Sequence, residues 1–215
     1  MEPEAKSQSG DPGGLDGFTP RVRLVLDSVH SAREAALPEC RKSIRESSLA
    51  IRAIHRRNSV EFEDHFSKAR SHLSIAQSAL SEFPDIAGAG FLHDAEKEVA
   101  EARLTLLLIE GRPLEEASEI GVRLPAWLNG LCEAASEVRR AMLQELRQGN
   151  LEIAKEMYET MEEVLDFLSL VDYPDAITGG LRRNVDSLRA VVERSASDLT
   201  LTLVQERLRS ALDKS

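Results

Sequence analysis

Residues 91–109 read FLHDAEKEVAEARLTLLLI, and this stretch points to the fold class of the whole chain. Its apolar residues recur at intervals of three or four, the spacing that gathers side chains on one face of an α-helix. The face consists of Phe91, Ala95, Val99, Ala102, Leu106 and Ile109. At about 100° per residue, Glu98 falls beside this face and Glu101 beyond it, so we expect both at the border of the core.

The same period recurs along the chain, and no segment alternates apolar and polar residues as a strand does. The sequence therefore predicts an all-α protein, a bundle of about six long antiparallel helices. These are expected at about residues 20–57, 59–83, 91–110, 125–148, 150–171 and 176–212. We expect Pro38 to kink or divide the first helix. Pro113 should open a short helix that reaches Ile120, and Asn150 should cap the helix that follows it.

The chain has 215 residues, enough for one large domain, which we place at residues 21–215. Residues 1–20 are polar and rich in Gly and Pro, so they are expected to be a disordered tail and not a signal peptide. No uncharged apolar run reaches 18 residues, which excludes a membrane-spanning helix. The two cysteines, Cys40 and Cys132, lie in separate predicted helices without a CxxC partner, so reduced thiols and a cytoplasmic location are expected.

Charge is unevenly distributed along the chain. The net charge of −10 argues against a nucleic-acid partner, but residues 21–57 carry nine basic and four acidic side chains. Residues 94–172, in contrast, are strongly acidic. A basic strip beside an acidic centre would suit a phosphate ligand held near a metal ion. An ordinary solvated helix face explains the same charges.

Two acidic motifs carry most of the functional information, Glu98-Val-Ala-Glu101 and Glu133-Ala-Ala-Ser-Glu137. Their spacings place each pair on one helical face, where like charges repel. Carboxylates brought together repel by roughly 4 kcal/mol per pair at about 4 Å and an effective dielectric near 20. A divalent cation removes this repulsion, and Mg²⁺ or Mn²⁺ prefers carboxylate oxygen.

Three chemistries of all-α proteins use such groups. Di-iron sites need Glu-x-x-His, which neither motif provides. Nucleotide pyrophosphatases and metal-dependent nucleases remain, and so does a protein whose acidic faces are merely solvated. Glu133 and Glu137 lie away from the main apolar face of their helix. Only a second helix packed on the small residues Gly130, Ala134 and Ala141 would enclose them.

The chain resembles the translin/TRAX family over roughly residues 37–201. The likeness rests on residues 41–45, on Lys68 to Leu73, on Glu98 to Ala102, on Trp127 to Glu137 and on residues 181–186. The second acidic motif is similar to a TRAX segment that has an aromatic residue, a glycine and then an aspartate four residues before a glutamate. Glu133 stands in place of that aspartate, a longer carboxylate that can still reach a metal ion.

The resemblance implies an all-α fold, multimeric shells that are often octameric, and binding of single-stranded RNA or DNA. For the TRAX branch it implies a Mg²⁺-dependent endoribonuclease, whereas translin lacks the full acidic set and mainly binds. On this basis Glu98, Glu101, Glu133 and Glu137 are the expected catalytic residues, and the first three the expected ligands of Mg²⁺ or Mn²⁺. The expected contacts to the nucleic-acid backbone are Arg41, Arg45, Lys68, Arg70 and His72.

The main alternative is a shell that binds single-stranded nucleic acid without cutting it. A nucleotide pyrophosphatase and a purely structural helical assembly protein are the other two. If the shell only binds, removing the glutamates would leave its RNA binding intact. Release of pyrophosphate from nucleoside triphosphates would identify a pyrophosphatase.

Overall fold

A computed structural model describes residues 17–88 and 90–213, and within these residues the chain is helical without a strand. The helices are α1 Thr19–His55, α2 Ser59–Ala79, α3 Pro84–Ala87, α4 Gly90–Ile109, α5 Ala117–Ile120, α6 Leu124–Gln148, α7 Leu151–Ser169, α8 Asp175–Thr178 and α9 Leu181–Leu212. Six of them are long, so the predicted all-α bundle is confirmed. The predicted tail falls mostly on residues 1–16, which lie outside the described residues, and α1 begins already at Thr19.

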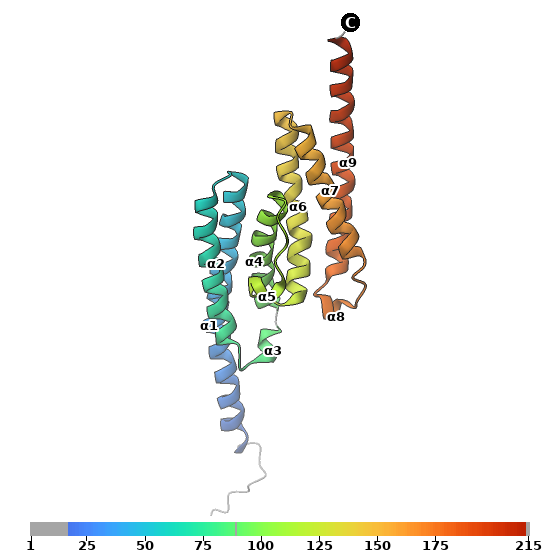
Figure 1. The fold of residues 1–215 in the computed structure, drawn as a ribbon. Helices are drawn as coiled ribbons and strands as arrows, with labels where there is room; N and C mark the ends of the chain where they lie inside the picture. The colour runs from blue at the N-terminus through green and yellow to red at the C-terminus, as the bar shows by residue number, and fades with distance from the viewer. Residues whose placement is uncertain (1–16, 89, 214–215) are drawn as a thin grey trace, which may run out of the picture.

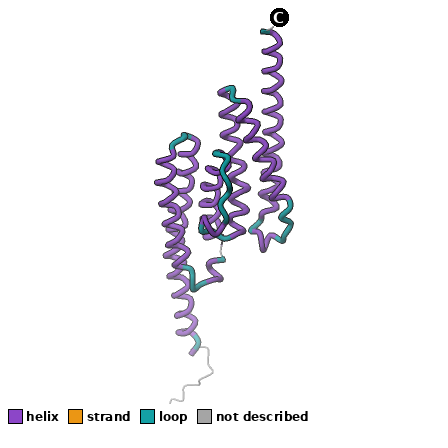
Figure 2. The backbone as a smooth tube through the Cα atoms, in the orientation of Figure 1, coloured by secondary structure: helices purple, strands orange, loops and turns teal. Residues whose placement is uncertain are grey.

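The long helices stack side by side in three groups (Figure 1). The hairpin of α1 and α2 lies on one side, α4 and α6 lie in the middle, and α7 and α9 lie on the other side. Helices that follow each other closely along the chain are antiparallel, but α4 and α6 run in the same direction. The chain between α4 and α6 makes this possible because it runs back along α4 before α6 begins, as the teal loop in Figure 2 shows.

The structure differs from the expected helices at three places. Helix α1 is one continuous helix of 37 residues with Pro38 inside it, and it is not divided there. Pro38 lies on the exposed face, where the carbonyl that loses its helical donor can bond to water. The short helix expected from Pro113 begins only at Ala117, where Glu116 and Glu119 form a capping box. Residues 84–87, which lie in none of the expected helices, form the single turn α3.

Helix α4, which α1, α2 and α6 contact, is the most enclosed of the long helices, because 12 of its 20 residues are buried. Helix α6 ends at Gly149, which adopts the left-handed conformation that glycine favours at a helix C-cap. Asn150 stands at the N-cap position of α7, but its side chain does not cap that helix and instead bonds to Glu145. Both cysteines are buried and free, and burial raises the pKa of Cys40 to about 11 and that of Cys132 to about 12. No helix in the described ranges is long and apolar enough to cross a bilayer.

The first turns of α1 and the last turns of α9 extend beyond their neighbours (Figure 1). Both overhanging ends carry exposed apolar side chains at helical spacing. On α1 these are Phe18, Val22 and Val25, and on α9 they are Leu201, Val204, Leu208 and Leu212. We call these two sets the α1 stripe and the α9 stripe.

Candidate metal centre

The structure brings Glu98 and Glu101 of α4 together with Glu133 of α6. Each of the three carboxylates offers an oxygen, and these oxygens all lie within 4.8 Å of one another. Glu101 is buried, with 8% of its surface exposed, while Glu98 and Glu133 are half-buried at the edge. We call these three residues the acidic cluster.

A close approach of the two helices at Gly130 creates the acidic cluster. A Cβ atom added to Gly130 would lie 2.7 Å from Cβ of Ala100, 2.8 Å from the carbonyl oxygen of Lys97 and 2.9 Å from the backbone nitrogen of Glu101. No side chain fits there, so glycine lets the backbones of α4 and α6 touch. The flank of small residues on α6 is therefore packed and not solvated. This packing encloses Glu101 more deeply than its place at the border of the α4 apolar face predicts.

Burial and mutual repulsion dominate the electrostatics of the cluster. Burial raises the pKa of Glu101 to about 9, and the charges of Glu98 and Glu133 act in the same direction. Burial also raises the pKa of Glu98, although Lys97 opposes that effect. The cluster therefore holds its negative charge at a free-energy cost that a divalent cation would remove.

Lys97 is the cation in contact with the cluster among the described residues. Its Nζ donates to both carboxylate oxygens of Glu133, at 2.7 and 2.8 Å, and lies 3.5 Å from Glu98. One ammonium thus faces three carboxylates, and no ion pair reaches Glu101 in the described part of the chain. Sequence reasoning missed Lys97, although its place one turn before Glu101 on the same helix was a usable signal.

Glu137, the fourth expected catalytic residue, lies beside the cluster and not within it. Its carboxylate lies 2.6 Å from Nε2 of His55, at the end of α1. The hydrogen bond from His55 lowers the pKa of Glu137. Because the His55 side chain is only 6% exposed, this pair fixes the end of α1 against α6. Unlike Lys97, His55 could not be connected to the acidic motifs from sequence spacing.

The five residues expected to contact nucleic acid lie on α1 and α2. The three on α2 have partners. Nζ of Lys68 lies 2.6 Å from Oδ2 of Asp64, and Nδ1 of His72 lies 2.6 Å from Oε2 of Glu39. Cζ of Arg70 lies 6.0 Å from the ring centre of Phe66. The two on α1, Arg41 and Arg45, are exposed and form no ion pair within the described ranges.

Arg52, which was not among the expected contacts, is also exposed and lies on the same face of α1 as Arg41 and Arg45. At about 100° per residue, these three side chains fall within roughly 40° of one another around the helix. We call them the arginine stripe. Their spacing of four and seven residues was a signal that the sequence already contained.

Two further buried carboxylates have cationic partners, unlike the acidic cluster. Glu96 of α4 accepts from Nε of Arg123 at 2.6 Å and from Gln77 at 3.0 Å. Glu145 of α6 accepts from the guanidinium of Arg57 and from Asn150. Burial of a carboxylate is therefore common in this fold, and what distinguishes the cluster is its shortage of positive charge.

No protein-family model matches the chain. It is 25% identical over 191 residues to an uncharacterized protein of Methanocaldococcus jannaschii, a match that covers 88% of this chain and 84% of that protein. Among solved structures, AfC3PO of Archaeoglobus fulgidus in a complex with duplex RNA is similar, with 30% identity and a TM-score of 0.76. That match covers 87% of this chain and 97% of AfC3PO. The structure of apo-NeC3PO is similar in fold, with 20% identity and a TM-score of 0.70 over 90% of this chain and 100% of that one.

Proposed function

The chain belongs to the translin/TRAX family, and on that premise we propose that it is a metal-dependent endoribonuclease that acts as part of a multimeric shell. The observation that carries the proposal is the acidic cluster: three carboxylates from two helices offer oxygens within 4.8 Å of one another, and Lys97 is the one cation in contact with them in the described part of the chain. Such a donor set fits a hard divalent cation, Mg²⁺ or Mn²⁺, which prefers carboxylate oxygen.

Glu98, Glu101 and Glu133 would hold the cation. A bound Mg²⁺ supplies polarisation of the scissile phosphate and a more acidic bound water. Because the metal site requires carboxylates, Glu101 has to give up its proton when the cation binds. Glu137 is the remaining acidic residue of the two motifs, and its hydrogen bond to His55 keeps it oriented beside the cluster. We assign it the role of accepting a proton from the attacking water.

The arginine stripe of Arg41, Arg45 and Arg52 would contact the RNA backbone. Arginine without an internal partner binds phosphate well and releases counterions, so binding should weaken as salt increases. Lys68, Arg70 and His72 on α2 would add contacts after exchanging their present partners for phosphate. The complex of AfC3PO with duplex RNA supports RNA as the ligand, and it makes duplex RNA a substrate to test beside single strands. Backbone contacts of this kind carry little sequence information.

The multimeric part of the proposal is supported by the α1 and α9 stripes. Leu201, Leu208 and Leu212 are each at least 60% exposed, which is unfavourable for leucines that form one face of a helix. Burying them against other copies of the chain would remove that apolar surface from water. Light scattering should report a mass several times that of one chain, and the charged substitutions Leu201→Glu and Leu208→Glu should reduce it.

The test of the nuclease is a cleavage assay with labelled single-stranded and duplex RNA, in Mg²⁺ and in chelator. We expect cleavage with Mg²⁺ only, and a loss of at least about a hundredfold for Glu98→Ala and for Glu133→Ala, because each removes a ligand. Glu156→Ala, which changes an exposed glutamate of α7, is the matched control and should cut like the wild type. If Glu98→Ala and Glu133→Ala cut as well as the wild type, the site is assigned wrongly.

A second candidate function is a shell that binds RNA without cutting it. The contact of Lys97 with Glu133 favours this alternative, because an ammonium already neutralises part of the cluster without a metal ion. In that case RNA binding would be salt-sensitive, would not need Mg²⁺, and would survive replacement of the glutamates.

A further inference from the structure

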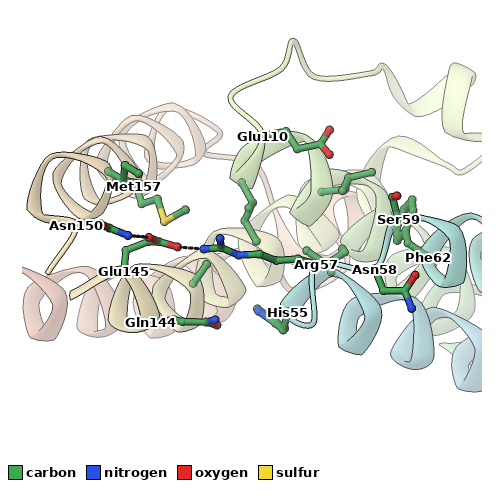
Figure 3. A pocket seen from close by; sticks show the side chains of 15 residues that line it. His55, Arg57, Asn58, Ser59, Phe62, Glu110, Gln144, Glu145, Asn150 and Met157 are labelled. Atoms are coloured by element: carbon green, nitrogen blue, oxygen red, sulfur yellow. Dashed lines mark hydrogen bonds and ion pairs between the residues drawn. The ribbon is translucent and has the colours of Figure 1, made fainter. Parts of the chain in front are cut away.

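A pocket of about 400 Å³ lies where the α1–α2 turn meets the ends of α4 and α6 and the start of α7. Figure 3 shows the side chains around it. Its apolar walls come from five helices and include Ile54, Phe62, Leu106, Ile109, Ala141 and Met157. The volume lies within the range of small-molecule sites, which are mostly apolar with a few polar groups that fix orientation.

Two polar side chains of the pocket have no hydrogen-bond partner within the described residues, Gln144 of α6 and Ser59 of α2. An amide and a hydroxyl both offer a donor and an acceptor. The other polar groups are engaged: Asn58 caps α2 through the backbone nitrogen of Glu61, and Asn150 donates to Glu145. The pocket therefore presents apolar walls and a small number of uncommitted neutral polar groups.

The charged groups of the pocket have ionic partners. Glu110, which also lines the pocket, accepts from Nη1 of Arg112 at 2.8 Å. The guanidinium of Arg57 donates to Glu145, whose side chain is only 5% exposed, and Asn150 donates to the same carboxylate at 2.7 Å (Figure 3). Arg57 has φ 56°, a left-handed conformation that glycine usually adopts at the end of a helix. An arginine in this conformation strains the backbone, and here its side chain reaches across to Glu145 of α6. A ligand with a net charge gains little from a wall whose charges are already paired.

The pocket lies next to the acidic cluster. Helices α4 and α6 run in the same direction, and the pocket follows the cluster on both: Leu106 comes five residues after Glu101, and Ala141 comes eight residues after Glu133. Five to eight residues correspond to about 8–12 Å along a helix. His55 connects the two places, because it lines the pocket and bonds to Glu137.

We propose that this pocket takes one unstacked nucleobase of the RNA strand whose backbone passes the acidic cluster. The inference rests on the proposed function for the identity of the strand. Apolar walls suit the faces of a base, and Gln144 and Ser59 suit its hydrogen-bonding edge. A base fits these observations better than a phosphate, which would need free cations, or a lipid chain, which would leave the polar groups unpaired.

The test measures binding of the four free ribonucleosides to the full-length protein by titration calorimetry, without metal and without RNA. We expect at least one nucleoside to bind, and Gln144→Leu to weaken that binding at least fivefold. Gln148→Leu makes the same change one turn further along α6, on an exposed residue outside the pocket, and should bind like the wild type. Ile153→Trp, which fills the pocket from a residue 45% exposed, should abolish binding without disturbing the core.

Failure of this proposal and failure of the nuclease can be told apart. RNA cleavage without nucleoside binding by the wild type would overturn the pocket proposal and leave the nuclease standing. Equal nucleoside binding by wild type, Gln144→Leu and Ile153→Trp would also overturn it, since the ligand would then lie elsewhere. Nucleoside binding that both variants lose, without any cleavage, would support the pocket and contradict the nuclease.

Discussion

Two buried glutamates of α4 stand five residues apart and have opposite surroundings. Glu96, 1% exposed, accepts from Arg123 at 2.6 Å and from Gln77 at 3.0 Å. Glu101, 8% exposed, faces the carboxylates of Glu98 and Glu133. The first has a cation from the protein itself, and the second has none in contact among the described residues.

The comparison separates a structural carboxylate from a candidate ligand. A buried carboxylate that is paired with a cation and fully hydrogen-bonded needs no further ligand, and removing its partner strongly destabilises the folded protein. A buried carboxylate that faces other carboxylates is strained until a cation or a proton arrives. The comparison predicts that changes around Glu96 affect folding, whereas changes around Glu101 affect metal binding.

The largest effect is expected for Arg123→Met, which leaves Glu96 buried without its cation. The free energy of unfolding should fall by about 3 kcal/mol, measured by chemical denaturation, which is the lower end for a buried pair because the Arg123 side chain is 45% exposed. Arg112→Met, which removes an exposed ion pair with Glu110, should cost less than about 1 kcal/mol. A comparably small loss for Arg123→Met would remove the distinction between the two glutamates.

The next effect is a pH dependence that belongs to Glu101. Its pKa is about 9 in the folded protein against a usual value of 4.5, so the folded state keeps a proton that the unfolded state releases. The stability that this proton contributes is fully present below pH 4.5 and is lost as the pH rises toward 9.

Between about pH 6 and pH 8, the metal-free wild type should therefore lose up to about 3 kcal/mol of stability relative to Glu101→Gln, whose amide does not ionise. Saturating Mg²⁺ should remove the difference, since it binds the ionised carboxylate. Parallel stability curves for the two proteins over this range would show that Glu101 is not held in its neutral form.

Gly130→Ala tests the packing that brings α4 and α6 together. The added Cβ would lie less than 3 Å from Ala100 and from the backbone of Lys97 and Glu101, so the helices have to separate. We expect a loss of about 1–3 kcal/mol in the free energy of unfolding and weaker metal binding. Gly90→Ala, at the start of α4 where nothing lies within 4 Å of the added atom, is the control and should change neither. Equal metal affinity for both variants would count against close packing as the origin of the cluster.

The smallest effect is expected for Lys97→Met. Its ammonium occupies both oxygens of Glu133, so it competes with a metal ion for that ligand. Removing the charge should tighten Mg²⁺ binding about fivefold, which corresponds to roughly 1 kcal/mol. Weaker binding by the variant would mean that Lys97 holds Glu133 in its position as a ligand and does not compete.

The long helices could be predicted because each one keeps an apolar face at helical spacing. The segment before α5 could not be predicted. Pro113 resembles the start of a helix, but the chain stays extended there because it has to run back along α4 before α6 begins. The undivided α1 was missed for a related reason. A proline breaks a helix by its local chemistry, but Pro38 lies on an exposed face and the buried residues on either side, Ala36 and Cys40, keep the helix packed.

The members of the acidic cluster could be named from their motifs, but their convergence depends on contacts that spacing does not encode. Gly130 is one of several small residues on α6, and only the structure shows that α4 touches it. His55 lies 82 residues before Glu137 in the sequence, so its contact could not be inferred from local pattern. Lys97 was within reach of sequence reasoning, because it directly precedes the first acidic motif on the same helix.

The most direct measurement is anomalous diffraction from crystals soaked with Mn²⁺. A single strong peak should lie between the side chains of Glu98, Glu101 and Glu133, within about 2.2 Å of a carboxylate oxygen from each, and it should be absent from crystals of Glu101→Gln. Crystals of the wild type with no peak at these three residues, or with peaks only elsewhere on the protein, would contradict the account.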